Sequence, residues 1–325
     1  MPLSGFLMDD LVPLVSIDCF TRKLFCSSSP SIPVALPSQR ETHFWYIIPD
    51  EVKDASLLNQ YLELLSPCEK KTILQMRGDK LQKGALLARA LVRTTLARYT
   101  DTQVSPSLLK FRKNKFGKPE VEWQHNEKWD PPSLHFNISH TSSLIACGVT
   151  VDMPIGIDVE EKERKTRNNP LSFAERYFSP HEVERLHAIT DPEIQQHEFI
   201  KLWTLKEAYV KALGRGFSAA PFKTFTIRFR SKIKSSSHVP IDSRSEDFEI
   251  VVEYPNDPEY SMTNWQFVLF ELASSHYAAI CVENDKIMEG EENHPLKLKV
   301  WRTIPFVEDE CVSGTDSVIT IRGLT

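Results

Sequence analysis

The order in which strand-like and helix-like segments follow one another constrains the fold of this chain most. The segment HFWYIIP, which begins at His43, has the apolar and aromatic character of a buried strand. A helical pattern follows over 57–99, where ALLARALVRTTLARY places an apolar stripe on one face and arginines on another. Two extended runs, LHFNISH and SLIACGVTV, come next. The first part of the chain therefore predicts a strand, then helices, then strands.

The same order returns in the second part of the chain. PIGIDVE is a strand-like run, and helices are predicted over EVERLHAI and from about 195 to 213. Strand-like segments then follow at about 222–230, 248–254, 265–272 and 276–283. No repeat of sequence is visible, but the repeated order of elements predicts two similar α+β halves.

Two helix ends are marked by the residues that cap them. Ser179-Pro180-His181-Glu182 matches a capping box, in which the serine hydroxyl accepts a hydrogen bond from the backbone of the glutamate. Gly214 follows the last helical residue, and glycine tolerates the left-handed conformation that ends many helices. We therefore expect one helix to begin after Ser179 and another to end at Gly214.

The chain of 325 residues is long enough for two domains of ordinary size. Residues 1–40 are predicted to be a flexible lead-in, because SSSPSIPVALPSQR over 27–40 is rich in serine and proline. We expect an N-terminal α+β half over 41–152 and a C-terminal α+β half over 153–285. Residues 286–325 show no clear period and are predicted to form a C-terminal extension.

The composition excludes several classes of protein. A formal net charge of -5 argues against a nucleic-acid binder. The N-terminal stretch lacks a basic start and is interrupted by Asp9 and Asp10, so it does not predict an export signal, and no apolar window reaches the ~18 residues of a membrane span. The cysteines are scattered without a Cys-x-x-Cys pair, which predicts free thiols in a cytoplasmic protein: Cys19, Cys26, Cys68, Cys147, Cys281 and Cys311.

The stretch NKFGKPEV over 114–121 is the first of three that carry candidate chemistry. Gly117 permits a tight turn and Pro119 stiffens its exit, so the turn presents Lys118 between them. An ordinary basic surface turn is the alternative interpretation, since Gly-Lys-Pro turns form readily.

The second stretch, FNISHT over 136–141, places a hydroxyl beside an imidazole. Both groups can donate hydrogen bonds to phosphate oxygens, and a protonated imidazole adds positive charge. A nucleophilic role for Ser139 is a rival interpretation, but neighbours on a strand point to opposite faces, so Ser139 and His140 would not pair easily. A strand end with satisfied polar groups is a further alternative.

The third stretch consists of GIDVE over 156–160 and WTLKEAYVKALGRG over 203–216. Asp158 and Glu160 lie two apart on a strand and can face the same side, whereas Glu207 and Lys211 lie four apart on a helix. If strand and helix meet, three carboxylates converge beside a lysine, which is the ligand set of a hard cation such as Mg²⁺. An ordinary helix ion pair would explain Glu207 and Lys211 but would leave the like charges on the strand unexplained.

These stretches, in this order, resemble the 4′-phosphopantetheinyl transferase superfamily, in particular the long type that activates surfactin synthetase and its eukaryotic relatives. The family's hallmark is a Gly-Ile-Asp-x-Glu strand, followed about 45 residues later by a Trp-Ser/Thr-x-Lys-Glu-x-x-x-Lys helix. Both parts are matched, by Gly156 to Glu160 and by Trp203 to Lys211. The Phe-Asn-x-Ser-His and Gly-Lys-Pro elements match as well, so the resemblance covers roughly 43–285.

The resemblance implies a pseudo-dimer of two α+β halves, with coenzyme A and the active site in the cleft between them. Asp158, Glu160 and Glu207 would hold magnesium together with the pyrophosphate, and Lys211 would contact phosphate. On the side of the nucleotide, the resemblance assigns the phosphates of coenzyme A to a further group of residues: Lys70, Lys118, Ser139 and His140.

The activity that the resemblance implies is that of a holo-[acyl-carrier-protein] synthase. The serine hydroxyl of an apo acyl or peptidyl carrier domain attacks the β-phosphorus of coenzyme A, 3′,5′-ADP leaves, and Glu207 takes the serine proton directly or through a water. Magnesium and Lys211 offset the charge on the phosphate oxygens. We expect a monomer that acts on carriers of fatty-acid, polyketide or nonribosomal-peptide synthases or of aminoadipate reductase, with no nucleic acid and no membrane as partner.

Two other functions are weighed against this one. A pseudoenzyme that only binds coenzyme A or a carrier domain would be expected to lack the carboxylates or Lys211, and this chain has all of them. A different magnesium-dependent nucleotide enzyme is disfavoured because the sequence contains neither a Walker-type loop nor a Gly-x-Gly-x-x-Gly turn.

Overall fold

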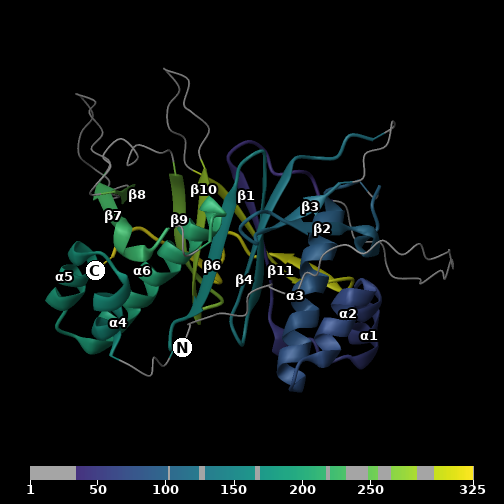
Figure 1. Ribbon diagram of the computed structural model, residues 1–325, viewed down its shortest axis with the longest axis horizontal. Helices are drawn as coiled ribbons and strands as arrows, with labels where there is room; N and C mark the ends of the chain where they lie inside the picture. Colours follow the sequence, from purple (N-terminus) through teal and green to yellow (C-terminus); the bar gives the residue numbers. More distant parts are fainter. Residues whose placement is uncertain are drawn as a thin grey trace. The chain divides into compact units, whose positions relative to one another are not determined.

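The chain folds into two compact units, each with helices and a sheet (Figure 1). The computed structural model describes residues 34–101, 103–123, 129–164, 169–216, 220–231, 248–254, 265–283 and 296–324. Unit 1 comprises Met1–Asp152 with Lys299–Val312, and unit 2 comprises Met153–Leu298 with Ser313–Thr325. The predicted α+β class with two halves is confirmed. Most of the predicted lead-in, 1–33, and the first part of the predicted extension, 286–295, lie outside the described residues.

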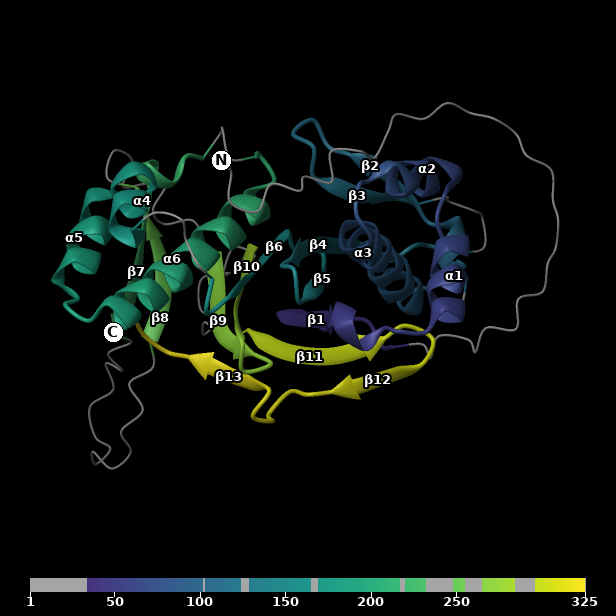
Figure 2. The same ribbon diagram turned by 90° about the horizontal axis from the view of Figure 1, so that it is seen from below.

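Unit 1 is a sheet with a long helix against it. The unit is built from β1 (Glu41–Ile47), α1 (Ala55–Glu63), α2 (Pro67–Gln75), α3 (Asp79–Arg98), β2 (Lys110–Lys113), β3 (Pro119–Glu122), β4 (Leu134–His140) and β5 (Ile145–Val151). A short 3-10 turn, η2 (Pro106–Leu108), precedes β2. The long helix α3 contacts β1, β4 and β5 (Figure 2). The segment predicted as helical over 57–99 is thus three helices in succession.

Unit 2 has the same kind of construction. Its elements are β6 (Ile155–Glu161), α4 (Pro170–Tyr177), α5 (Pro180–Ala188), α6 (Pro192–Leu213), β7 (Thr226–Ser231), β8 (Phe248–Glu253), β9 (Trp265–Leu272) and β10 (His276–Glu283). The 3-10 turn η4 (Phe222–Thr224) precedes β7. The long helix α6 contacts β6, β9 and β10. Within the described residues, no helix combines the length and the apolar character needed to cross a membrane.

The two units repeat one topology. In each, a first strand is followed by three helices, a separate two-stranded ladder and two more strands. The first strand pairs with the last and the last with the one before it, which gives β1-β5-β4 in unit 1 and β6-β10-β9 in unit 2. The repeated order of elements in the sequence therefore reflects a repeated fold.

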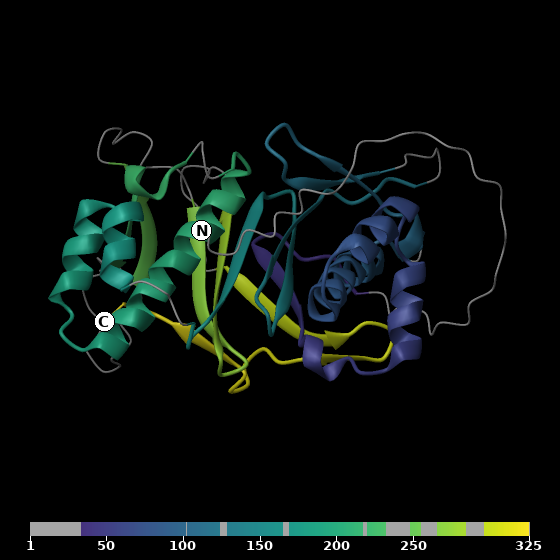
Figure 3. The same ribbon diagram turned by 60° about the horizontal axis from the view of Figure 1, so that its bottom comes forward.

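The residues predicted as a C-terminal extension add strands to both sheets (Figure 3, yellow). β11 (Lys297–Ile304) lies beside β1 and carries β12 (Glu308–Cys311) at its other edge, whereas β13 (Val318–Ile321) pairs with β9. In unit 1 the Trp301 ring of β11 stacks on Trp45 of β1, with 4.5 Å between ring centroids. The Trp45 indole also donates a hydrogen bond to the Tyr99 hydroxyl at 2.9 Å. β11 is therefore part of the core of unit 1.

Both predicted helix ends are confirmed. Ser179 and Glu182 form a complete capping box at the start of α5, and Pro180 is its first helical residue. Gly214 ends α6 in the left-handed conformation, with φ of 60°.

A buried ion pair joins the start of the second helix to the long helix in each unit. In unit 1, Arg93 of α3 donates to the Glu69 carboxylate of α2 at 2.6 Å. In unit 2, the Lys206 ammonium of α6 lies 2.8 Å from the Glu182 carboxylate of α5. Each glutamate belongs to the capping box of its own helix. We call these two arrangements the unit 1 lock and the unit 2 lock.

The strand β6 and the helix α6 approach each other closely at Gly156. A β-carbon at this position would lie 2.0 Å from the carbonyl oxygen of Ala208 and 2.2 Å from the amide nitrogen of Ala212. Backbone atoms of a packed helix cannot move aside alone, so any side chain at position 156 must displace α6. The glycine therefore sets how near α6 lies to the strand.

We predict that Gly156→Ala lowers the free energy of unfolding by about 3 kcal/mol, the upper part of the usual range for overpacking, because the clash is with backbone. Urea denaturation measures the change. Gly84→Ala on α3 is the control: among the residues that the structure describes, no atom beyond the neighbouring residues and the backbone of α3 lies within 4 Å of its β-carbon position. There the substitution is expected to stabilise the helix by about 0.5–1 kcal/mol. Equal effects of the two substitutions would contradict the close-approach role of Gly156.

Candidate functional site

Asp158 and Glu160 are buried on β6, where they lie on the same side of the strand. Asp158 is opposite Ala279 of β10, and Glu160 is opposite Tyr277. Their exposed fractions are only 1% and 3%. Carboxylates are rarely buried to this degree unless cations or hydrogen-bond donors compensate their charge. These two buried carboxylates therefore indicate a candidate functional site on unit 2.

The helix α6 brings a lysine and a third carboxylate to this strand. The Lys211 ammonium donates to Asp158 Oδ1 at 2.6 Å. Glu207 lies one helical turn before Lys211, so both side chains share a face of α6. The close contact at Gly156 allows this approach, because it places the helix backbone directly against β6. Strand and helix meet as the spacing of the sequence suggested.

Burial and mutual repulsion change the protonation of these groups. Burial, together with the neighbouring Asp158 carboxylate, raises the pKa of Glu160 to about 8. Burial also raises the pKa of Glu207 to about 7; Lys211 opposes this rise and Asp158 adds to it. Burial alone would lower the pKa of Lys211, but Asp158 and Glu207 outweigh it and hold that pKa above its usual value. The three carboxylates therefore act on one another and on the lysine as one electrostatic cluster.

Arg164 is a member of this cluster that the sequence reasoning missed. Its guanidinium donates to Glu160 Oε2, and its charge lowers the pKa of both Glu160 and Glu207. The Gln196 side chain of α6 holds the Arg164 backbone by donating to its carbonyl at 3.0 Å. The only signal in the sequence was a basic residue shortly after the GIDVE strand. The sequence does not define the path of the turn that follows Glu161. A basic residue at position 164 therefore could not show that the Arg164 side chain returns to Glu160.

The donor set suits a hard cation, although the side chains are not gathered around a common point. Among the described residues, no group of three or more Asp, Glu, His or Cys side chains is arranged to hold a metal ion. Lys211 and Arg164 instead supply the positive charge beside Asp158 and Glu160. Glu160 Oε1 is nevertheless buried without a hydrogen-bond partner in the part of the chain that the structure describes. An oxygen of this kind, in a cluster of carboxylates, fits Mg²⁺.

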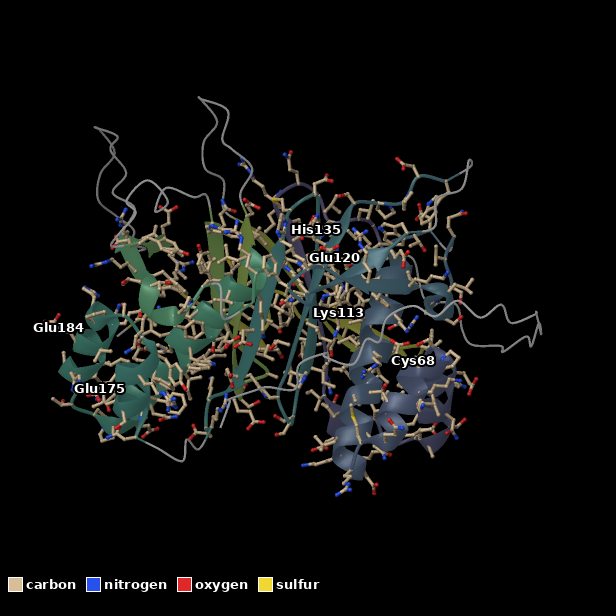
Figure 4. The ribbon with its side chains drawn as sticks, viewed as in Figure 1. Cys68, Lys113, Glu120, His135, Glu175 and Glu184 are labelled. Carbon is tan, nitrogen blue, oxygen red and sulfur yellow. The ribbon has the colours of Figure 1, made fainter. Side chains whose placement is uncertain are left out.

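The other predicted site residues lie on unit 1. Lys118 follows Gly117, whose φ is 94°, in the turn between β2 and β3, and the Asn114 side chain fixes this turn by accepting from the amides of Phe116 and Lys118. Burial lowers the pKa of His135 on β4, and the charge of Lys118 lowers it further. Figure 4 labels His135 together with Lys113 and Glu120 of the hairpin. Lys118 is therefore near β4.

Ser139, His140 and Lys70 have different surroundings. Ser139 and His140 are the last residues of β4; Ser139 is buried and His140 is half-buried, as expected for neighbours on opposite faces of a strand. Lys70 lies in α2, where its ammonium donates to Glu63 at 3.0 Å on the surface. The phosphate-binding roles assigned to Lys70, Lys118, Ser139 and His140 stay predictions.

Comparison with known proteins identifies the family of both parts of the chain. A family model described as the 4′-phosphopantetheinyl transferase superfamily matches residues 154–281. A second, described as the N-terminal part of 4′-phosphopantetheinyl transferase, matches residues 53–150. These two matches cover the first strand and the long helix of unit 2 and most of unit 1.

Individual relatives agree with the family models. The chain is 31% identical to the 4′-phosphopantetheinyl transferase Sfp of Bacillus subtilis over 203 residues, which are 62% of this chain and 82% of the relative. It is 34% identical to another 4′-phosphopantetheinyl transferase of Bacillus subtilis, over 48% of this chain and 61% of the relative. It is 32% identical to the 4′-phosphopantetheinyl transferase HetI of Nostoc, over 55% of this chain and 70% of the relative. The chain therefore belongs to the 4′-phosphopantetheinyl transferase superfamily and is an enzyme of the Sfp-like long type.

Proposed function

We propose that this enzyme transfers the 4′-phosphopantetheine group of coenzyme A to a serine of an apo carrier domain and releases 3′,5′-ADP, with Mg²⁺ as its cofactor. The observation that carries the proposal is the meeting of Asp158 on β6 with Lys211 on α6, one turn after Glu207, in a chain of this family. The acceptors are acyl or peptidyl carrier domains of fatty-acid, polyketide or nonribosomal-peptide synthases or of aminoadipate reductase.

The roles of the side chains follow from their charges and positions. The Lys211 ammonium donates to Asp158 at 2.6 Å and is proposed to donate also to phosphate oxygens of coenzyme A. Asp158, Glu160 and Glu207 would hold Mg²⁺, which when bound supplies positive charge beside the phosphate oxygens. Glu207 accepts the proton of the attacking serine, directly or through one water. Lys70, Lys118, Ser139 and His140 are proposed to bind the phosphates of coenzyme A.

The transfer reaction itself tests the proposal. The chain is incubated with coenzyme A, MgCl₂ and an apo carrier domain, and mass spectrometry follows the carrier. We expect the carrier to gain one phosphopantetheine arm on its serine while 3′,5′-ADP appears. A carrier of unchanged mass, with coenzyme A bound, would instead support a binding module without activity.

The metal assignment predicts that Asp158→Asn loses at least about a hundredfold in transfer rate, because a bound cation contributes several kcal/mol of transition-state stabilisation. Asparagine keeps the shape of the buried side chain, which limits the damage to packing. A second readout is independent of activity: MgCl₂ is expected to raise the Tm of the wild type and not that of Asp158→Asn, because a ligand stabilises only the form that binds it.

The control for this prediction is Glu184→Gln, which removes an exposed carboxylate of α5 on the same unit (Figure 4). It is expected to keep both the transfer rate and the response to MgCl₂. Full activity of the wild type in excess chelator would refute the magnesium site.

Glu207 and Lys211 are predicted to fail in different ways. Glu207→Gln keeps the size and one acceptor oxygen but loses basicity, so kcat is expected to fall at least about a hundredfold while coenzyme A still binds. Lys211→Met is expected to weaken coenzyme A binding and also to lower kcat, since phosphate is present in both the ground state and the transition state. Steady-state kinetics with a coenzyme A titration separates the two patterns. Turnover near that of the wild type in Glu207→Gln would exclude its role as proton acceptor.

A further inference from the structure

Lys206 stands directly before Glu207 on α6, and none of the roles above uses it. Its side chain is fully buried, with an exposed fraction of 0%. The ammonium donates to the carbonyl oxygens of Phe222 at 2.9 Å and Phe225 at 2.8 Å, and it lies 2.8 Å from Glu182 Oε2. An ammonium has three donors, so all of them are occupied. Lys206 has no donor left for a ligand.

The partners of Lys206 are themselves fixed. Glu182 Oε2 accepts from the Ser179 amide at 3.0 Å in the capping box of α5. Glu182 Oε1 accepts from the Ile227 amide at 2.8 Å, which ties it to β7. The rings of Phe178, Phe222 and Phe225 surround the ammonium, and the Phe225 centroid is 4.1 Å away. The unit 2 lock therefore connects α6 to α5 and to the segment that leads into β7.

The lock acts on the site through the geometry of the helix. Successive residues of an α-helix are rotated by about 100° about its axis, so the direction of Lys206 determines the direction of Glu207. Gly156 brings α6 close to β6, but a glycine has no side chain with which to fix the rotation of the helix. The three partners of the Lys206 ammonium can all be reached in only one orientation of α6. These contacts therefore fix the rotation of the helix about its axis.

Unit 1 contains the same lock, but no carboxylate follows its cation along the helix. Arg93 follows Glu69 by 24 residues, and Lys206 follows Glu182 by the same interval. Arg93 donates to the carbonyl oxygens of Pro106, the first residue of η2, and Leu109, which follows η2, both at 2.9 Å. Phe222 and Phe225 hold the same two positions about η4. The residue after Arg93 is Thr94, which has no carboxylate.

We infer that Lys206 is a positioning residue of the transfer reaction, which sets the rotation of α6 and so aims Glu207 and Lys211 at Asp158. The inference rests on the proposed function. Lys206, which directly precedes Glu207, would thus act by orienting α6 and not by contacting phosphate. The unit 1 lock serves as an internal comparison, since it fixes the long helix of the other unit in the same manner.

The test replaces each lock by a neutral pair. Glu182→Gln with Lys206→Met removes the unit 2 lock, and Glu69→Gln with Arg93→Met removes the unit 1 lock. Glutamine at these positions retains the capping box, so α5 and α2 can still begin where they do. Wild-type transfer is measured first. If the wild type does not transfer, the proposed function fails, and that result is separate from any effect of Lys206.

With an active wild type, both double variants are expected to melt at lower temperature, and rates are measured per folded molecule below both transitions. The unit 2 variant is expected to lose at least tenfold in kcat, since misplacement by about 1 Å can cost a hundredfold. It should also need more MgCl₂ for half of its maximal rate, because Glu207 no longer faces Asp158. The unit 1 variant should keep the wild-type kcat and MgCl₂ requirement.

Two outcomes overturn the inference: a wild-type kcat in the unit 2 variant, or equal losses in the two variants, which would show a purely structural role. If the unit 2 variant does not fold, Glu182→Gln alone replaces it. That variant keeps Lys206 and both carbonyl partners but loses the anionic acceptor, so a smaller loss of kcat is expected. In this case too, a wild-type kcat would count against the positioning role.

Discussion

A buried cation held by one carboxylate and two carbonyl oxygens is the constraint on which each half of this protein depends. An isolated buried ammonium or guanidinium carries a desolvation penalty of several kcal/mol, so it is tolerated only where every partner is in place. Arg93 and Lys206 each have three such partners, which come from two segments, the short helix and the 3-10 turn. Because such a contact tolerates little displacement, it orders the short helix, the long helix and the 3-10 turn of each unit together. Apolar packing alone would allow more freedom of rotation.

The fixed position of α6 keeps the charged side chains of the candidate site close together, although the like charges among them repel one another. Burial and the repulsion of the neighbouring Asp158 carboxylate on β6 both raise the pKa of Glu160. Lys211 and Arg164 offset that repulsion, and the close contact at Gly156 allows α6 to bring Lys211 to Asp158. Burying such a cluster of charges is costly for stability, and proteins commonly accept a cost of this kind where function requires it.

The sequence predicted those features that depend on spacing along one element. The capping box at Ser179, the end of α6 at Gly214 and the shared face of Asp158 and Glu160 all follow from the local periodicity of the backbone. The returning Arg164, the lock at Lys206 and the insertion of β11 beside β1 depend on partners distant in the chain or on turns whose path the residues do not state. The repeat itself was visible only as an order of elements, because the two locks use different cations.

The comparison of the two long helices shows that equivalent positions carry cations with different partners in the two units. Five residues after its lock, α3 carries Arg98 and α6 carries Lys211. Arg98 donates to both carboxylate oxygens of Asp309, at 2.5 and 3.0 Å, and Asp309 comes from the added strand β12. Lys211 is paired with Asp158 of β6, the first strand of its own unit, and remains partly exposed at 27%. Bidentate ion pairs are strong, so we expect Arg98 to keep Asp309 as its partner. The same offset on the helix therefore places a buried arginine in a bidentate ion pair in one unit and a partly exposed lysine beside a buried carboxylate in the other.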